Sequence, residues 1–259
     1  MILSCSPRLP LTPYVECLWH YEGEAPLHSR ECVLPDGRFH LMLNLEAGVA
    51  TLAGLRSRHV VIDTATAFFV MGVVFRPGAA RAFLAASAVD FRDRAVGLDL
   101  VWGFSSARRL LDQLRAAGTA VARLRIVESA LIDRMQKFGR QELSMHPGVR
   151  YALQAFSDAP HIRTVVDVSG ELGFSRRWLS HAFAEQVGMT PKRYCRLVRF
   201  QHVVRQIASQ RPVDWADLAM AGGFYDQSHL VHEFRAFSGL PPESFLAAER
   251  PFPNHVQLR

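Results

Sequence analysis

Two polar segments of the sequence follow a Gly-Phe pair, Gly173-Phe174 and Gly223-Phe224, about fifty residues apart. In both segments, side chains that form hydrogen bonds recur at three- and four-residue spacing, which a helix places on one face. Guanidinium, hydroxyl, amide and imidazole groups on such a face can bind phosphates and base edges of double-stranded DNA. The predicted contacts are Ser175, Arg176, Arg177, Ser180 and His181 in the first segment, and Asp226, Gln227, Ser228, His229, His232 and Arg235 in the second.

Apolar residues around each segment predict the helices that would position these faces. The inward positions are Val165, Val168, Leu172, Leu179, Phe183 and Val187 around the first segment, and Leu218, Leu230, Phe234 and Phe237 around the second. A short helix, a glycine turn and a second helix with one polar face form the helix-turn-helix layout, whose second helix enters the DNA major groove. The two recognition helices are expected at about residues 175–187 and 226–237.

Helix-end signals predict an all-α C-terminal part of about seven helices. Thr164-x-x-Asp167 resembles a capping box, Gly173 suits a left-handed helix end, and Ser175 suits the next N-cap. Pro191 follows the capping residue Thr190 at the first helical position. The expected helices cover residues 149–156, 164–172, 175–187, 190–208, 214–222 and 226–237, and a last one opens at Pro241-Pro242.

The helix over 190–208 would connect the two units. At 1.5 Å per residue it spans roughly 28 Å, close to the separation of about 34 Å between successive major-groove segments on one side of B-DNA. A single chain could then read a non-palindromic site. Lys192, Arg193 and Arg196 on this connector are candidate phosphate contacts, whereas Arg199 and Phe200 are expected to brace the two units.

Residues from about 146 to 250 resemble the DNA-binding domain of AraC/XylS-type bacterial transcriptional regulators. The motifs that carry the resemblance are Leu172-Gly173-Phe174-Ser175, Leu179-Ser180-His181-Ala182-Phe183, Gly188-Met189-Thr190-Pro191, Arg199-Phe200, Gly223-Phe224-Tyr225-Asp226-Gln227-Ser228-His229-Leu230 and Phe237-Ser238-Gly239-Leu240-Pro241-Pro242. The resemblance implies sequence-specific DNA binding in a bacterial cytoplasm. It also implies that the other half senses a signal, mediates dimerisation, or both.

Two positions depart from the family pattern, which has an arginine in each recognition helix where His181 and His232 stand here. An arginine can hold guanine with two hydrogen bonds, worth roughly 1–3 kcal/mol of discrimination, whereas a neutral imidazole offers one donor and one acceptor. The base preference at these positions is therefore open. Ser169 also replaces an alanine common where the two helices pack.

Composition and charge set the class of protein. Of 259 residues, 49% are hydrophobic and 21% charged, which is typical of a folded chain. The net charge is +6 overall, and residues 146–259 carry 13 Lys/Arg against 10 Asp/Glu, so the DNA prediction rests on placement and not on net charge. The longest uncharged apolar stretch, Thr64–Phe75, is too short for a membrane span. With no secretory signal pattern and four scattered cysteines, the chain is expected to be reduced and cytoplasmic.

The N-terminal half is predicted as a β-rich α+β domain over residues 1–142, ahead of the DNA-binding domain at 146–250 and a tail at 251–259. Val15, Cys17, Trp19 and Tyr21 alternate with Glu16, Leu18 and His20, the period-two pattern of a half-buried strand. Further strands are expected at 39–45 and 67–75, with a short helix at 79–86. Helices at 105–117 and 121–138 would pack on the sheet or form a dimer interface, and the former is favoured.

Pro35-x-Gly37-x-x-His40-x-x-x-Asn44 resembles the second motif of cupin barrels, where a histidine binds metal. The first cupin motif is missing and a useful site needs three or more ligands, so the segment is interpreted as a turn entering a strand. No metal and no cofactor is predicted. Residues 72–79 are similar to the sensor halves of some AraC-type regulators.

Three functions for the N-terminal half are open at this point. A small-molecule-modifying enzyme would need His20, Glu22, His28, His40 and Asp63 to cluster, and no nucleophile elbow or phosphate loop accompanies them; an enzyme is therefore not expected. A sensor of an unidentified small-molecule effector and a protein-interaction module are the other two. RNA polymerase and a second copy of the chain are candidate partners besides DNA, and no membrane is predicted.

Overall fold

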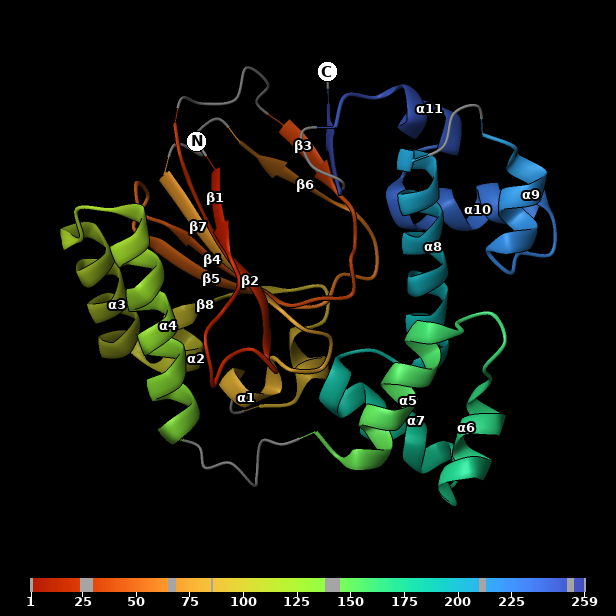
Figure 1. The fold of residues 1–259 in the computed structure, drawn as a ribbon, viewed down its shortest axis with the longest axis horizontal. Coiled ribbons are helices and arrows are strands. Elements are labelled where there is room, and N and C mark those ends of the chain that lie inside the picture. Colours follow the sequence, from red (N-terminus) through yellow and green to blue (C-terminus); the bar gives the residue numbers. More distant parts are fainter. Residues whose placement is uncertain are drawn as a thin grey trace.

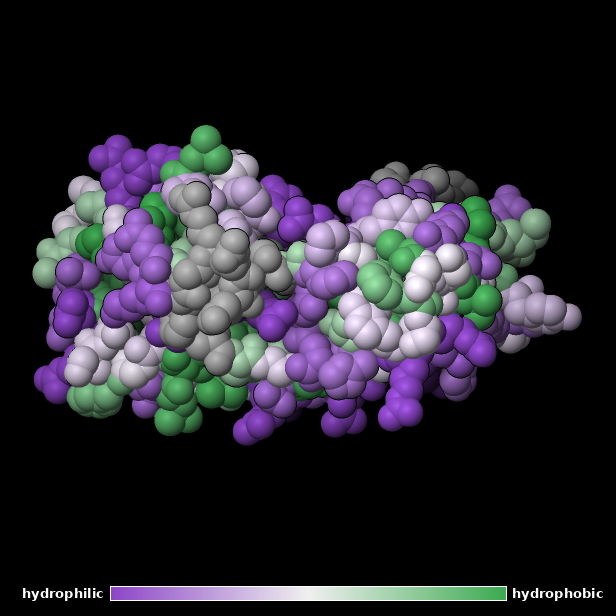
Figure 2. All heavy atoms as spheres, turned by 90° about the horizontal axis from the view of Figure 1, so that it is seen from below, coloured by the Kyte–Doolittle hydropathy of each residue, from purple (hydrophilic) through white to green (hydrophobic). Residues whose placement is uncertain are grey.

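The computed structural model describes residues 2–23, 30–64, 69–84, 86–137, 145–209, 213–250 and 254–258. Two lobes lie side by side (Figure 1), with the strands and their helices in one and the seven C-terminal helices in the other. Seen from below, hydrophilic side chains cover much of both lobes (Figure 2), and the outline is hollowed where the lobes meet. The predicted fold class, a β-rich N-terminal domain with trailing helices followed by a helical domain, is confirmed.

The main sheet has six antiparallel strands in the order β1-β2-β7-β4-β5-β8. The strands are β1 (Ile2–Cys5), β2 (Val15–Glu22), β4 (His40–Asn44), β5 (Val49–Ala53), β7 (Phe69–Phe75) and β8 (Ala95–Gly97). Strand β7 pairs with both β2 and β4, and most of its residues are buried. The apolar run that ends at Phe75 therefore forms an interior strand, as its composition predicts.

Strand β2 changes the face that it buries after Val15. Val15, Leu18 and His20 are buried, while Cys17, Trp19 and Tyr21 are half-buried. The pairing with β7 shifts register between Val15 and Cys17, and one extra residue in a strand turns every later side chain to the opposite face. The predicted half-buried strand is present, and beyond Val15 its buried face carries Leu18 and His20.

A second sheet joins a strand near the C-terminal end to two strands of the N-terminal lobe. It has the order β6-β3-β9, with β3 (Arg30–Val33), β6 (Val60–Asp63) and β9 (His255–Gln257). Strand β9 lies in the segment that the sequence presents as a tail, and it pairs Val256 with Cys32. The last described residues thus return to the N-terminal lobe and complete its smaller sheet.

The helices α2 (Leu98–Trp102), α3 (Phe104–Ala116) and α4 (Ala120–Lys137) pack against the main sheet and lie together on one side of it (Figure 1). The short helix α1 (Arg81–Leu84) contacts α4, and the 3-10 helix η1 (Ala88–Phe91) contacts α7 (Arg176–Val187) of the C-terminal lobe. Leu114 on α3 and Leu131 on α4 are fully buried, so these helices pack on the sheet, as favoured above. Between the two lobes the sequence predicts a linker, from a break at Gly139 to the stretch Ser144–Gly148. Residues 138–144 lie outside the described residues, and α5 (Pro147–Asp158) already begins within that stretch with His146 as its N-cap, so the end of the predicted linker is helical.

Seven helices form the C-terminal lobe around the long helix α8, as Figure 1 shows. They are α5 (Pro147–Asp158), α6 (Val165–Leu172), α7 (Arg176–Val187), α8 (Pro191–Ser209), α9 (Trp215–Ala221), α10 (Gln227–Ser238) and α11 (Pro242–Ala247). Each predicted helix is present within a few residues of its expected bounds. No helix among the described residues is long and apolar enough to span a bilayer.

Candidate nucleic-acid interface

Local hydrogen bonds build the first helix-turn-helix from α6 and α7. Thr164 Oγ1 accepts from the Asp167 amide, and Asp167 accepts in return from the Thr164 amide, which completes the capping box. Gly173 ends α6 with a left-handed φ of 70° and allows the turn at no steric cost. Ser175 Oγ then accepts from the Trp178 amide and caps α7. Buried Ser169 donates to the Val166 carbonyl within α6, which satisfies its hydroxyl.

The turn of this first unit is held by an aromatic cluster. Phe174 stacks on Trp178 with ring centroids 4.0 Å apart, and His146 packs edge-on against both rings. Such contacts add about 0.5–1.5 kcal/mol per pair beyond the area they bury. The cluster therefore holds the start of α7 in a set orientation relative to α5.

The polar face of α7 is open at the start of the helix and covered at its end. Arg176, Arg177 and His181 are exposed, and Ser180 is half-buried. Leu179 and Phe183 are fully buried on the opposite side. At the far end, the Ser87 hydroxyl beside η1 donates to the Glu185 carbonyl at 3.3 Å. The surface that α7 can present to a partner is thus its first two turns.

The second helix-turn-helix, α9 and α10, repeats this arrangement. Asp214 caps α9 by accepting from the Ala216 and Asp217 amides, and Gly223 makes the turn at φ 70°. Asp226 accepts from the His229 amide at 2.7 Å, and His229 Nδ1 accepts from the Tyr225 amide.

Two predicted contacts of the second unit, Asp226 and His229, therefore already form hydrogen bonds to backbone amides at the start of α10. The other predicted residues, Gln227, Ser228, His232 and Arg235, are exposed. Their side chains form the part of α10 that is open to a partner.

Helix α8 holds both units through buried contacts. Tyr194 packs edge-on against Phe183 of α7, and Phe200 stacks on Phe237 of α10 with centroids 5.0 Å apart. Arg199 donates to the Gly223 carbonyl at 2.9 Å and lies over the Phe224 ring. The connector is thus packed against the turn and the second helix of the distal unit, and cannot swing freely.

The three candidate phosphate contacts on α8 have different surroundings. Arg196 makes two hydrogen bonds to the Glu233 carboxylate of α10, at 2.7 and 2.8 Å. Burial by itself would raise the pKa of Glu233, but the Arg196 guanidinium outweighs burial and holds that pKa below its ordinary value. The charge of Arg196 is therefore already balanced, which disfavours the predicted phosphate contact. Lys192 is exposed and Arg193 is half-buried, and neither forms an ion pair within the described part of the chain.

Contacts between the lobes were not predicted from the sequence. The buried amide of Gln201 on α8 donates to the Pro35 carbonyl at 2.7 Å and to Asn254 just before β9. The His59 amide donates to the Phe237 carbonyl, at the end of α10. A glutamine in an amphipathic helix does not indicate a partner 166 residues away. No sequence pattern could therefore have predicted these hydrogen bonds of Gln201, which we call the amide clamp.

The candidate catalytic and metal-binding residues of the N-terminal lobe do not form one site. His20 lies near Arg123 and Glu22, with His20 Nε2 3.4 Å from Arg123 Nη1. His40 instead pairs with Asp36 at 3.1 Å, and Asp63 is at the end of β6 in the other sheet. His28 lies outside the described residues. Across the described ranges no three His, Cys, Asp or Glu side chains are arranged to hold a metal ion.

Comparison with known families gives this geometry its context. Residues 168–248 match the family described as a helix-turn-helix domain. The matched segment runs from α6 to α11 and includes both helix-turn-helix units. For this segment the match confirms the AraC-type resemblance seen in the sequence, and it supports a DNA-binding transcriptional regulator. Residues 3–97 match a domain of unknown function, DUF6597.

Solved structures of AraC-type proteins are among those similar to this chain. The C-terminal domain of AraT, a response regulator from Geobacillus stearothermophilus, is 19% identical, with 40% of this chain and 86% of that chain covered and a TM-score of 0.38. A regulator with an AraC-type DNA-binding domain from Chromobacterium violaceum is 20% identical, with 39% and 90% covered and a TM-score of 0.36. ToxT from Vibrio cholerae is 10% identical, with 95% and 97% covered and a TM-score of 0.42. The comparison with curated proteins gave no match.

Proposed function

We propose that the chain is a sequence-specific transcriptional regulator that reads two adjacent major-groove segments, one with α7 and one with α10. The observation that carries this proposal is the pair of capped helix-turn-helix units packed on one helix, α8, with both polar faces open. Helix α8 has 19 residues, which corresponds to roughly 28 Å. That length is close to the spacing of about 34 Å between neighbouring major-groove segments.

The exposed groups divide into two proposed roles. Arg176, Arg177, Ser180 and His181 would contact base edges or phosphates from α7, and Gln227, Ser228, His232 and Arg235 would do so from α10. At the start of each recognition helix, backbone amides are bound by side chains whose main effect is to fix the direction of the helix: Ser175 for α7, and Asp226 and His229 for α10. Lys192 and Arg193 would bind phosphate beside the first unit, since phosphate contacts fix register and base contacts fix sequence.

Selection of binding sites from a random duplex pool, with the purified full chain, tests the proposal. We expect a motif of two unlike elements separated by about one helical turn of DNA, 10–10.5 base pairs. The variants His181→Ala and His232→Ala control for each other, because each removes an imidazole from one unit only. Each should change the preferred bases in one element and leave the other as it was. Recovery of a single element, or of an unchanged motif with both variants, would contradict the two-helix reading.

For the N-terminal lobe we propose a sensing role, with the domain bounds 1–142 and 146–250. The amide clamp from Gln201 to Pro35 and the contact of η1 with α7 support it, because a ligand that moves the N-terminal lobe would move both reading helices. Thermal-shift screening against metabolites tests this role. The full chain is needed, since β9 completes the smaller sheet. A saturable shift supports a sensor, turnover of a compound would support the enzyme alternative, and no shift would favour control by a protein partner.

A further inference from the structure

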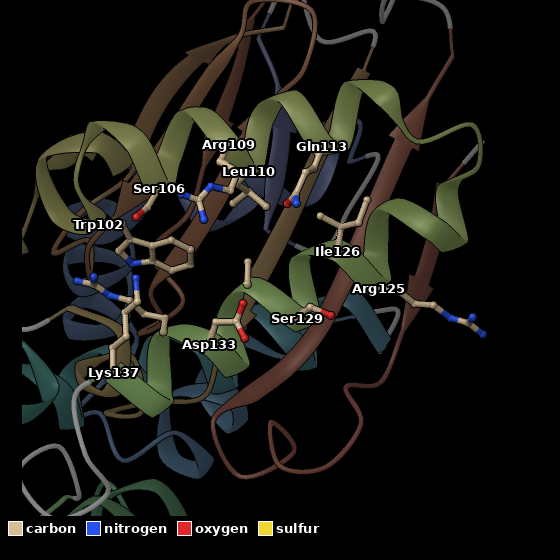
Figure 3. Close-up of a pocket in the computed structure, with 12 residues that line it drawn as sticks. Trp102, Ser106, Arg109, Leu110, Gln113, Arg125, Ile126, Ser129, Asp133 and Lys137 are labelled. Atoms are coloured by element: carbon tan, nitrogen blue, oxygen red, sulfur yellow. The ribbon is translucent and has the colours of Figure 1, made fainter.

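A groove of about 450 Å³ runs along the N-terminal lobe between α3 and α4. Pockets that hold small molecules typically measure about 300–1,000 Å³. Figure 3 shows side chains of both helices lining it, with the Trp102 indole at one end. Leu110, Ile126 and Ala130 supply apolar surface along its length. Helices α3 and α4 lie on the far side of the lobe from the C-terminal helices (Figure 1), and no residue of α7 or α10 lines the groove, so it is separate from the DNA-reading faces.

The charged groups in the groove are mostly positive. Arg109 reaches into it from α3, and Asp133 and Lys137 do so from α4, whereas Arg125 points away from it (Figure 3). Arg109, Lys137 and Asp133 are exposed, and none of the three forms an ion pair with another described residue. Two cations against one carboxylate leave an excess positive charge that is not balanced by the protein itself.

The aromatic end of the groove is held firmly. Trp102 Nε1 donates to the Phe83 carbonyl at 3.1 Å, so the polar atom of the indole is satisfied. Arg134 donates to the carbonyls of Phe83 and Val101 and lies 5.6 Å from the indole ring centroid. The indole is therefore held in place, and because Trp102 is only 8% exposed it presents a narrow apolar edge to the groove, against which the edge of a ring can pack.

We propose that this groove binds a small organic monoanion with an aromatic body. The ring would lie against Trp102 and the apolar floor, and its carboxylate would bind Arg109 and Lys137. Asp133 opposes a second negative charge, which selects a monoanion over a dianion. The inference names a ligand class for the proposed sensing role and rests on that role for its biological meaning.

Calorimetric titration of the full chain with naphthoate at low ionic strength tests the groove. We expect saturable binding, weaker by about tenfold in Arg109→Gln and in Lys137→Gln, because each removes one charge-assisted hydrogen bond. Asp133→Asn should strengthen binding by about threefold, since it removes a repelling charge. The neutral naphthamide and the dianionic naphthalenedicarboxylate should both bind more weakly than naphthoate.

Arg108→Gln is the matched control, because Arg108 neighbours Arg109 on α3, is also exposed, lies near Asp112 and does not line the groove. Equal affinity in Arg108→Gln and Arg109→Gln, or no saturable binding, would overturn the proposal. A wild-type dimer that dissociates in Arg109→Gln without binding naphthoate would assign the groove to a second copy of the chain, and would also overturn it. The titration contains no DNA, so its failure leaves the proposed DNA reading untouched.

Discussion

Replacing Arg196 should destabilise the C-terminal lobe without changing how strongly DNA binding depends on salt. Arg196 holds both carboxylate oxygens of Glu233, and the Glu233 side chain is only 9% exposed. Removing one partner of a buried ion pair costs about 3–5 kcal/mol. Because the Arg196 side chain is 39% exposed, solvent screens part of this interaction, and we expect about 1–2 kcal/mol for Arg196→Gln.

Lys192 is the matched comparison on the same helix. It is exposed and has no ion-pair partner among the described residues. If it binds a phosphate, Lys192→Gln should lower the slope of log affinity against log salt by about 0.9 and leave stability nearly unchanged. Arg196→Gln should instead lower the stability and leave the salt slope nearly unchanged.

Two measurements separate the variants: urea unfolding of the free protein, and fluorescence anisotropy with a selected duplex over a range of salt concentrations. The double variant Arg196→Gln, Glu233→Gln should recover much of the lost stability, because it no longer leaves a buried carboxylate without its cation. The reasoning is refuted if Arg196→Gln keeps wild-type stability and loses as much salt slope as Lys192→Gln.

Three further predictions concern the fold. Phe200 is fully buried between α8 and α10, so Phe200→Ala should lower the free energy of unfolding by about 3–5 kcal/mol, measured by urea unfolding. It should also weaken binding to the DNA element read by α10, measured by anisotropy with the selected duplex. Gly173→Ala should lower the free energy of unfolding by about 1 kcal/mol because of the left-handed φ at this position. Gly170→Ala, inside α6 with open space around it, should raise the free energy of unfolding by about 0.5–1 kcal/mol. A change of the same sign in both variants would contradict this. Burial, and then the nearby Arg123, lower the pKa of His20 below its ordinary value of 6.5, so the unfolded chain takes up the proton first and stability falls as pH drops below about 6.5. His20→Gln should flatten this loss in urea titrations between about pH 7 and pH 5.

The helices of the C-terminal lobe follow from local sequence. The side chains of Thr164, Asp167 and Ser175 each accept a hydrogen bond from an amide three residues away. Gly173 supplies a left-handed backbone conformation that other residue types adopt with strain. All of these interactions lie within a single helix turn. The apolar residues at three- and four-residue spacing then place one face inward. The helix ends, the two turns and the open polar faces can therefore be predicted from the sequence alone.

The long-range pairings were decided by the tertiary structure. The sequence marks Arg196 as a basic residue on a helix surface, and only the packing of α10 on α8 gives it the buried carboxylate of Glu233. Strand β9 pairs with β3 because the C-terminal lobe returns residues 255–257 to the N-terminal lobe. The α3–α4 groove likewise depends on how two helices pack on the sheet. Caps and turns are set by neighbours in the chain, whereas ion pairs, strand partners and grooves are set by residues that only folding makes neighbours.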